Sequence, residues 1–420
     1  MSDRVCLCID LKSFYASVEC VDKGLDPLTA LLVVADPERT EKTICLAITP
    51  AMKALGIRNR CRVFEIPKNI KYVMATPRMQ RYIDVSADIY SIYLRYVAKE
   101  DIHVYSIDEV FMDVTEYLEL YKMSAKELAA RIIRDIYETT GITATCGIGT
   151  NLYLAKIAMD ITAKHVDDHM GELTEESFRE TLWNHRPLTD FWRIGPGTVR
   201  KLEQYGIYTM RDIAKADEDL LYRLFGIDAE LMIDHAWGRE SATIQDIKAY
   251  KPRHNSLSSG QVLSRDYSMQ EGLLLCKEMA ELLCLDLVEK GLITDNISIM
   301  LSYASGSIKG GDNGSISLGM ATSSSRMILP YIEKLYNKMA DSECFIRRIG
   351  ISFNNVVDEA FVQYDIFTDP EELERDRKLQ KAMVGVRNKY GKNAILKGMN
   401  LEKGGTTIER NKQIGGHRSG

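Results

Sequence analysis

Residues 105–115, YSIDEVFMDVT, place two adjacent carboxylates, Asp108 and Glu109, in an otherwise apolar, β-branched and aromatic run. Carboxylates in such surroundings are costly to desolvate unless a positive group compensates them. Adjacent side chains of an ideal strand point to opposite faces, so the two acids share a site only where the strand starts or bulges at a turn. Two interpretations stay open, a divalent-metal site or a turn that Asp108 caps while Glu109 is solvated. Asp113 alternates in phase with Glu109, and we interpret it as structural.

The flanking segments predict a sheet that brings a third acid to this turn. VCLCID (5–10) is apolar on both alternations, as in a central strand, and residues 102–115 have the pattern of a hairpin. Ser124 and Glu127 form a capping box before a helical repeat of leucine and isoleucine, and TATCGIGT (143–150) supplies another strand. Strand, helix, hairpin, helix and strand predict an α+β fold with helices on one face of an antiparallel sheet. Asp10 then lies within reach of the hairpin turn.

The second half of the chain has a different organisation. After residue 171 short helical segments follow, and IGPGTVRKLEQYGI (194–207) predicts two helices joined by a tight turn. The amides of that turn could hold a DNA phosphate, although a plain helical hairpin fits equally well. Residues 242–255 lack periodicity and indicate a linker. Residues 256–360 then predict strand, helix, strand, strand, helix, strand, the order of the first sheet.

Composition limits the class of protein. At 420 residues with 45% hydrophobic residues, the chain can form several folded domains. It has no apolar run of membrane-spanning length, and its nine cysteines lack a CxxC pair, which favours a cytoplasmic protein with reduced thiols. The net charge is −6, but eleven Lys or Arg against two Glu from Arg377 onward give that end a charge of about +9. Such a segment is either a polyanion-binding tail or a solvated basic helix.

The acids suggest a specific chemistry. Two-metal phosphoryl transfer needs two divalent ions about 4 Å apart, bridged by carboxylates that contact both. Phe14 and Tyr15, just after Asp10, could form a wall that excludes a 2′-hydroxyl, or they could be core residues. Lys53 and Lys164 are candidates to neutralise a triphosphate.

Five motifs together resemble one family. IDLKSFYASVE (9–19), AMKALGI (51–57), YSIDEVFMDVT, GIGTNLYLAKIA (147–158) and the GPG turn (195–197) occur in the order and approximate spacing of Y-family translesion DNA polymerases of the bacterial polymerase IV/UmuC type. The resemblance covers roughly residues 4–240, and it is looser through IRRIGISF (346–353). It implies a right-hand polymerase with a ferredoxin-like palm (1–13 and 79–170), small fingers (14–78), a helical thumb with a helix-hairpin-helix (171–241) and a βαββαβ little finger (256–360).

The resemblance also implies residue roles. Asp10, Asp108 and Glu109, with the Leu11 carbonyl, would hold two Mg²⁺ ions for low-fidelity, template-directed addition of dNTPs to a primer 3′-OH. Tyr15 would be the sugar gate, and Phe14 would line the same pocket. The remaining assignments are nucleotide contacts by Lys53 and Lys164 and primer-template DNA contacts by Gly195, Gly197, Arg347 and Arg348.

Some features depart from the polymerase IV pattern. Pro50 and Lys53 stand where many members carry Tyr and Arg, as in the UmuC-like branch, and one extra residue separates Lys164 from the LAKIA motif. In the last segment (361–420) FVQYDIF resembles a sliding-clamp peptide with Gln363, Ile366 and Phe367 as its contacts, followed by the basic tail. A UmuD-like or recombinase accessory protein is a further expected partner.

Two alternatives use the same residues differently. A nucleotidyl cyclase has a similar sheet and two metals, but it does not need the GPG hairpin or the third unit. A non-catalytic DNA- and clamp-binding accessory protein would have a degenerate palm, which the intact Asp10, Asp108 and Glu109 argue against.

Overall fold

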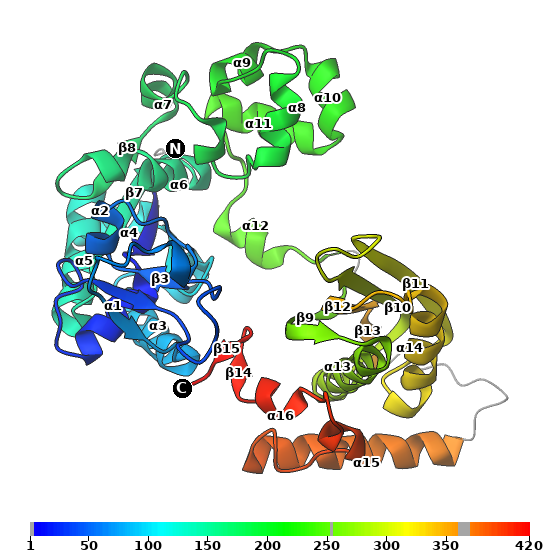
Figure 1. Ribbon diagram of the computed structural model, residues 1–420. Coiled ribbons are helices and arrows are strands. Elements are labelled where there is room, and N and C mark those ends of the chain that lie inside the picture. The colour runs from blue at the N-terminus through cyan, green and yellow to red at the C-terminus, as the bar shows by residue number, and fades with distance from the viewer. Residues whose placement is uncertain (1–3, 253–254, 360–369) are drawn as a thin grey trace. The chain divides into compact units, whose positions relative to one another are not determined.

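The computed structural model describes residues 4–252, 255–359 and 370–420 (Figure 1). The chain divides into two compact units, Met1–Tyr250 with Arg418–Gly420, and Lys251–His417. The division falls in the predicted linker, residues 242–255, but that segment is not wholly irregular. It contains α12 (Ile244–Ala249), which begins with a capping box in which Thr243 accepts from the Asp246 amide.

A five-stranded sheet in the order β5-β6-β1-β7-β8 is the centre of the first unit. β1 pairs antiparallel with β6 and β7, and β8 pairs parallel with β7. The α+β prediction is confirmed. The strands of this sheet are β1 (Cys6–Leu11), β5 (Ile102–Val104), β6 (Glu109–Asp113), β7 (Ala144–Gly149) and β8 (Met170–Leu173).

Helices cover both faces of this sheet, whereas the sequence predicted helices on one face. Cys6, Cys8 and Phe111 pack against α6, and the alternate residues Leu7 and Ile9 are also fully buried. Burial on both alternations is the physical reason for the continuous apolar run in β1. The helices around the sheet are α3 (Met79–Tyr93), α4 (Thr115–Tyr121), α5 (Ala125–Thr140) and α6 (Leu152–Asp160).

A smaller three-stranded sheet, in the order β3-β2-β4, lies between β1 and α3 in the sequence. The apolar run TICLAIT (43–49) is the pattern of a strand, but it is mostly irregular, because only β3 continues the ladder and Ile44 forms an isolated bridge with Arg62. The elements of this region are α1 (Phe14–Asp22), β2 (Leu32–Val34), β3 (Ala47–Ile48), α2 (Pro50–Ala54), η1 (Val63–Glu65) and β4 (Val73–Ala75). The short 3₁₀ turns η2 (Lys99–Asp101) and η3 (Thr162–His165) also belong to this unit.

Short helices form the rest of the first unit, as predicted for residues after 171. Their common core includes Phe178, Phe191, Leu202 and Leu221, all almost fully buried. The elements are α7 (Glu175–Thr181), η4 (Leu188–Asp190), α8 (Pro196–Glu203), α9 (Met210–Lys215), α10 (Glu218–Phe225) and α11 (Asp228–Trp237).

The second unit has the predicted βαββαβ element order, but the order of strands in its sheet differs from that of the first unit. The sheet runs β11-β10-β12-β9, so its fourth strand lies between its first and second strands. In the first unit the initial strand, β1, lies between β6 and β7 instead. The two units therefore share the order of elements along the chain and differ in strand order. The elements are β9 (Leu257–Tyr267), α13 (Met269–Lys290), β10 (Leu292–Tyr303), β11 (Gly311–Thr322), α14 (Ser325–Met339), β12 (Ile346–Asn354) and β13 (Val357–Asp358).

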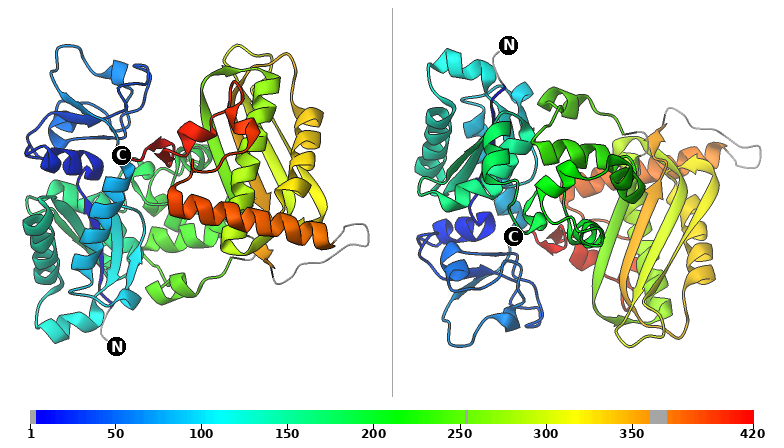
Figure 2. Two further views of the ribbon diagram at one scale, coloured as in Figure 1. Left: turned by 90° about the horizontal axis from the view of Figure 1, so that it is seen from below. Right: turned by 90° about the horizontal axis from the view of Figure 1, so that it is seen from above.

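The basic C-terminal segment is folded. Its helix α15 (Pro370–Tyr390) packs against α13 (Figure 2), and it continues through η6 (Gly398–Leu401), α16 (Thr407–Arg410), β14 (Gln413–Ile414) and β15 (His417–Arg418). Glu278 of α13 is 1% exposed and accepts hydrogen bonds from Asn400 Nδ2 at 2.9 Å and from the Thr406 amide at 2.8 Å. Lys397 pairs with the buried Glu281. Some polar and positive groups of this segment therefore bind buried acids of α13. Neither the polyanion-binding tail nor the solvated basic helix anticipated such contacts.

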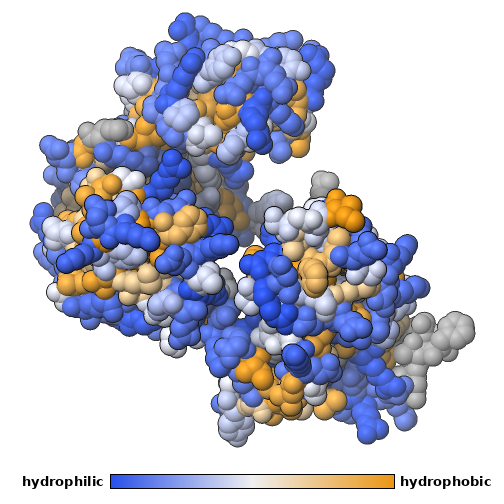
Figure 3. Space-filling model, viewed as in Figure 1, coloured by the Kyte–Doolittle hydropathy of each residue, from blue (hydrophilic) through white to orange (hydrophobic). Residues whose placement is uncertain are grey.

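Hydrophilic side chains cover most of the face shown in Figure 3, and apolar ones occur there in small separate groups. None of the helices in the described part of the chain combines the length and apolar character needed to cross a bilayer.

Candidate active site

The sheet of the first unit brings the three predicted acids together at one end of β1. Asp10 is the register partner of Glu109, the first residue of β6. Asp108 is in the preceding turn, where its carbonyl accepts from the Leu11 amide at 2.9 Å. The two adjacent acids thus occur where the strand begins, which is one of the two arrangements that allow them to serve a common site.

Hydrogen bonds fix the turn itself. The Tyr105 and Ser106 amides donate to the Glu109 carbonyl at 3.0 and 3.1 Å. The Ser106 hydroxyl donates to Asp108 Oδ1 at 2.6 Å. Asp113, at the other end of β6, accepts from Thr115 and faces Arg4, in agreement with a structural role.

Both carboxylate oxygens of Glu109 have partners within the protein. Oε2 accepts from Lys156 Nζ at 2.8 Å, and Oε1 accepts from Cys8 Sγ at 3.3 Å. Glu109 and Lys156 are 9% and 7% exposed. Lys156 Nζ also lies 3.1 Å from Asp160 Oδ2, one helical turn further along α6. Lys156, Asp160 and Cys8 were not assigned from the sequence, although the LAKIA motif contains Lys156.

Burial and neighbouring charges raise the pKa values of Asp10 and Glu109. Burial, and then the charges of Asp108 and Glu109, raise the pKa of Asp10 to about 7, against the opposing charge of Lys156. Burial raises the pKa of Glu109, and Lys156 acts in the opposite direction. The site therefore holds more negative charge than its one buried lysine compensates, a situation that a divalent cation relieves.

The donor set fits a hard cation, because three carboxylates offer only oxygen atoms. Among the described residues, however, no three His, Cys, Asp or Glu side chains lie close enough together to enclose an ion. Glu109 is bonded to Lys156 instead. Coordination would therefore use the remaining lone pairs of Glu109 or require its carboxylate to turn.

The two predicted aromatic residues differ in their surroundings. Tyr15 stacks on Tyr82 with ring centroids 4.4 Å apart, and burial together with the charge of Asp108 raises its pKa. Tyr15 therefore lies beside the acids. Phe14 is 2% exposed, and its ring centroid is 5.8 Å from that of Tyr15. Phe14 supports Tyr15 from within the core.

Three lysines surround the same end of β1. Burial lowers the pKa of Lys53, as does the charge of Lys164, while Asp10 opposes the shift. Burial and the charge of Lys53 lower the pKa of Lys12, which was missed from the sequence although it belongs to IDLKSFYASVE. In the part of the chain that the structure describes, none of the three forms an ion pair. They form a cationic group beside the acids.

The GPG turn starts a helix close to the hairpin. Gly195 is the N-cap residue of α8, and a Cβ added at Gly195 or Gly197 would meet no heavy atom within 4 Å. Upstream, Trp192 Nε1 donates to the Tyr105 hydroxyl at 3.1 Å, and a hollow extends from Asp160 along residues 189–195. The turn is therefore accessible and belongs to the same unit as the acids.

The remaining predicted residues belong to the second unit. Arg347 and Arg348 are on β12, where Arg347 lies 3.6 Å from Asp266 and Arg348 is exposed. Gln363, Ile366 and Phe367 lie outside the described residues.

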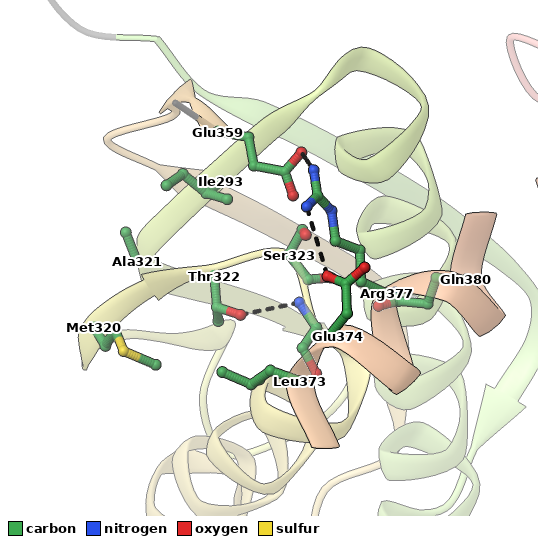
Figure 4. Close-up of a pocket in the computed structure, with 11 residues that line it drawn as sticks. Ile293, Met320, Ala321, Thr322, Ser323, Glu359, Leu373, Glu374, Arg377 and Gln380 are labelled. Atoms are coloured by element: carbon green, nitrogen blue, oxygen red, sulfur yellow. Dashed lines mark hydrogen bonds and ion pairs between the residues drawn. The ribbon is translucent and has the colours of Figure 1, made fainter. Parts of the chain in front are cut away.

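A pocket beside α15 is too small for a nucleotide. In Figure 4, Arg377 reaches across it to Glu359, which it contacts at 2.6 Å. Its volume of about 60 Å³ suits a few water molecules rather than a nucleotide.

Comparisons with known proteins extend over nearly the whole chain. Residues 9–160 match the model of the impB/mucB/samB family, and residues 254–366 match that of its C-terminal domain. The putative UV-damage repair protein UvrX of Bacillus subtilis is 32% identical, with 98% of this chain and 97% of that protein covered. DNA polymerase IV 2 of the same organism is 29% identical, with 99% of both chains covered. A solved structure of a Y-family DNA polymerase chimera of Dbh and Dpo4 is 21% identical, covers 84% of this chain and 99% of its own, and has a TM-score of 0.66.

Proposed function

Because the chain belongs to the impB/mucB/samB family and is a Y-family translesion DNA polymerase, we propose that Asp10, Asp108 and Glu109 form its catalytic metal centre. One observation carries the proposal. The register pairing of Asp10 with Glu109, and the turn that holds Asp108, gather three carboxylates from distant parts of the chain. We assign residues 1–13 and 79–170 to the palm, 14–78 to the fingers, 171–241 to the thumb and 256–360 to the little finger.

The reaction is an in-line attack of the primer 3′-OH on the α-phosphate, with pyrophosphate as the leaving group. Two Mg²⁺ ions, when bound, would activate the attacking oxygen and neutralise the leaving group. The three carboxylates, with the Leu11 carbonyl, offer the oxygen ligands. The Ser106 hydroxyl holds Asp108 in place for this role, because it donates to Oδ1.

The cationic group and the aromatic ring bind the incoming dNTP. Lys53, Lys164 and Lys12 supply positive charge for the triphosphate, since none of them forms an ion pair with another described residue. Tyr15 packs against the sugar and leaves no room for a 2′-hydroxyl. Its stacking on Tyr82 holds the ring in place.

DNA and protein partners use other surfaces. The accessible amides at Gly195 and Gly197 suit a DNA phosphate, and Arg347 and Arg348 add charge from the second unit. Residues 363–367 are a sliding-clamp motif, and point substitutions such as Phe367→Ala are the appropriate test. A truncation would also remove the segment that folds on α13. We further propose a cytoplasmic location and a UmuD-like or recombinase accessory partner.

Primer extension with Mg²⁺ and dNTPs tests the function. The native chain should extend a primer, and Asp108→Asn with Glu109→Gln should lose extension while it keeps the circular dichroism spectrum of the native chain. Failure of a folded native sample to extend would leave the non-catalytic DNA-binding alternative. Extension by the double variant would remove these acids from the centre.

A further inference from the structure

A buried lysine that none of the roles above uses contacts the acidic centre directly. Lys156 is on α6, 7% exposed, with Nζ 2.8 Å from Glu109 Oε2 and 3.1 Å from Asp160 Oδ2. We propose that Lys156 is a positioning residue of the polymerase, which holds the Glu109 carboxylate in place and supplies the positive charge that this carboxylate needs until a divalent cation binds. This inference rests on the proposed role of Glu109.

The close packing of α6 on β7 fixes the backbone from which the Lys156 side chain extends. A Cβ on Gly147 would lie 2.0 Å from the Ala155 carbonyl oxygen, and a Cβ on Gly149 would lie 2.2 Å from the Ala155 amide nitrogen. The helix therefore lies almost directly on β7 at the residue before Lys156. The ammonium of Lys156 is also held by Asp160 on the same helix, so it marks where the Glu109 carboxylate rests.

The Glu109 carboxylate has enough lone pairs to bind Lys156 and a metal ion at the same time. A lysine ammonium has three donors, and Glu109 and Asp160 take two of them. Each carboxylate oxygen of Glu109 has two lone pairs. One lone pair of Oε2 accepts from Lys156, and one lone pair of Oε1 accepts from Cys8. Each oxygen keeps a lone pair that an ion can use while Lys156 still holds the side chain.

Lys156 and a divalent cation can each compensate the negative charge of Glu109. Without Lys156, the buried Glu109 would face Asp160, Asp10 and Asp108 without its ion-pair partner, an arrangement that destabilises a folded protein. A divalent cation beside the same carboxylates supplies that missing charge. The Lys156→Met chain should therefore be less stable than the native chain without metal and should recover when metal is added.

Thermal unfolding followed by tryptophan fluorescence reads this effect, because Trp183, Trp192 and Trp237 all belong to the first unit. In EDTA the midpoint of Lys156→Met should fall by about 5 °C, and excess Mg²⁺ should raise it more than it raises the native midpoint. Lys126→Met removes an exposed ion pair with Asp168 in the same unit and should show neither change. An EDTA loss that Mg²⁺ does not reduce would assign Lys156 to packing alone and overturn the proposal.

A second variant keeps the test decisive if Lys156→Met does not fold. Glu109→Gln with Lys156→Met removes both charges, and its midpoint in EDTA should lie above that of Lys156→Met alone. An equally low midpoint would contradict the proposal. Lys156→Arg retains the charge and should behave like the native chain in EDTA.

Kinetics separate positioning from nucleotide binding. Lys156→Met should lower the extension rate at saturating dNTP and Mg²⁺ by about tenfold while the KM for dNTP stays within about twofold. A large rise in that KM with an unchanged rate would make Lys156 a triphosphate ligand and overturn the proposal. Failure of the native chain to extend primers would refute the proposed function instead, and the comparison in EDTA would still decide whether Lys156 holds Glu109.

Discussion

Replacement of Gly147 by alanine should force α6 away from β7. The added Cβ would lie 2.0 Å from the Ala155 carbonyl oxygen and 2.3 Å from the Met159 amide nitrogen, and both atoms are backbone. Relief of such an overlap needs a shift of about 1 Å in a packed helix, and overpacking of this kind costs about 3 kcal/mol. Because α6 carries Lys156, the same shift would disturb Glu109.

Urea unfolding followed by tryptophan fluorescence measures the cost, since the tryptophans belong to the first unit. The midpoint of Gly147→Ala should fall by about 1 M. Gly197→Ala is the matched control, because its Cβ would meet no heavy atom within 4 Å, and it should unfold within about 0.5 kcal/mol of the native chain. A native-like midpoint for Gly147→Ala would refute the close approach of α6 to β7, and with it the fixed position of Lys156.

Three further predictions concern other parts of the chain. The Arg265 guanidinium holds the pKa of Glu271 at about 2, so Glu271 stabilises the fold above its unfolded pKa of about 4.5 and loses this effect as pH falls toward 2. By calorimetry, Glu271→Gln should lower the free energy of unfolding by about 1 kcal/mol at neutral pH, because the pair is partly exposed. The difference in unfolding free energy from the native chain should vanish near pH 2. A difference that stays constant with pH would contradict the ion pair. Tyr15→Ala should incorporate ribonucleotides more readily in primer extension, and unchanged sugar discrimination would remove Tyr15 from the sugar gate. Glu278→Ala removes the acceptor of the Thr406 amide and one acceptor of the Asn400 side chain, so trypsin should cut the C-terminal segment faster, and native-like resistance would show that these contacts do not anchor the segment.

Local sequence patterns predicted the elements that form the site. The Ser124–Glu127 capping box starts α5 as expected. The adjacent acids Asp108 and Glu109 predicted a strand start or a bulge at this point, and β6 begins at Glu109. Both features depend on neighbours along the chain. The meeting of Asp10 with the hairpin followed from pairing two apolar strands.

Other features depend on contacts between distant segments, which a single sequence does not encode locally. The ion pair of Lys156 with Glu109 joins residues 47 positions apart, and it needs two glycines in β7 that let α6 approach. The C-terminal segment is also held by such contacts. Lys397, Asn400 and Thr406 bind the buried Glu278 and Glu281 of α13. Within α15, Gln380 donates to the Ser323 carbonyl and Asn388 donates to Glu289. The strand order of the second unit is likewise fixed by packing between strands far apart in the chain.

The central claim is that Asp10, Asp108 and Glu109 gather two divalent ions. Anomalous scattering from Mn²⁺ in crystals of the chain with primer-template DNA and a non-hydrolysable dNTP tests it most directly. We predict two Mn²⁺ peaks about 4 Å apart, each with oxygen ligands from these acids. Peaks elsewhere in the first unit, or none at these carboxylates in a complex that holds both substrates, would contradict the claim.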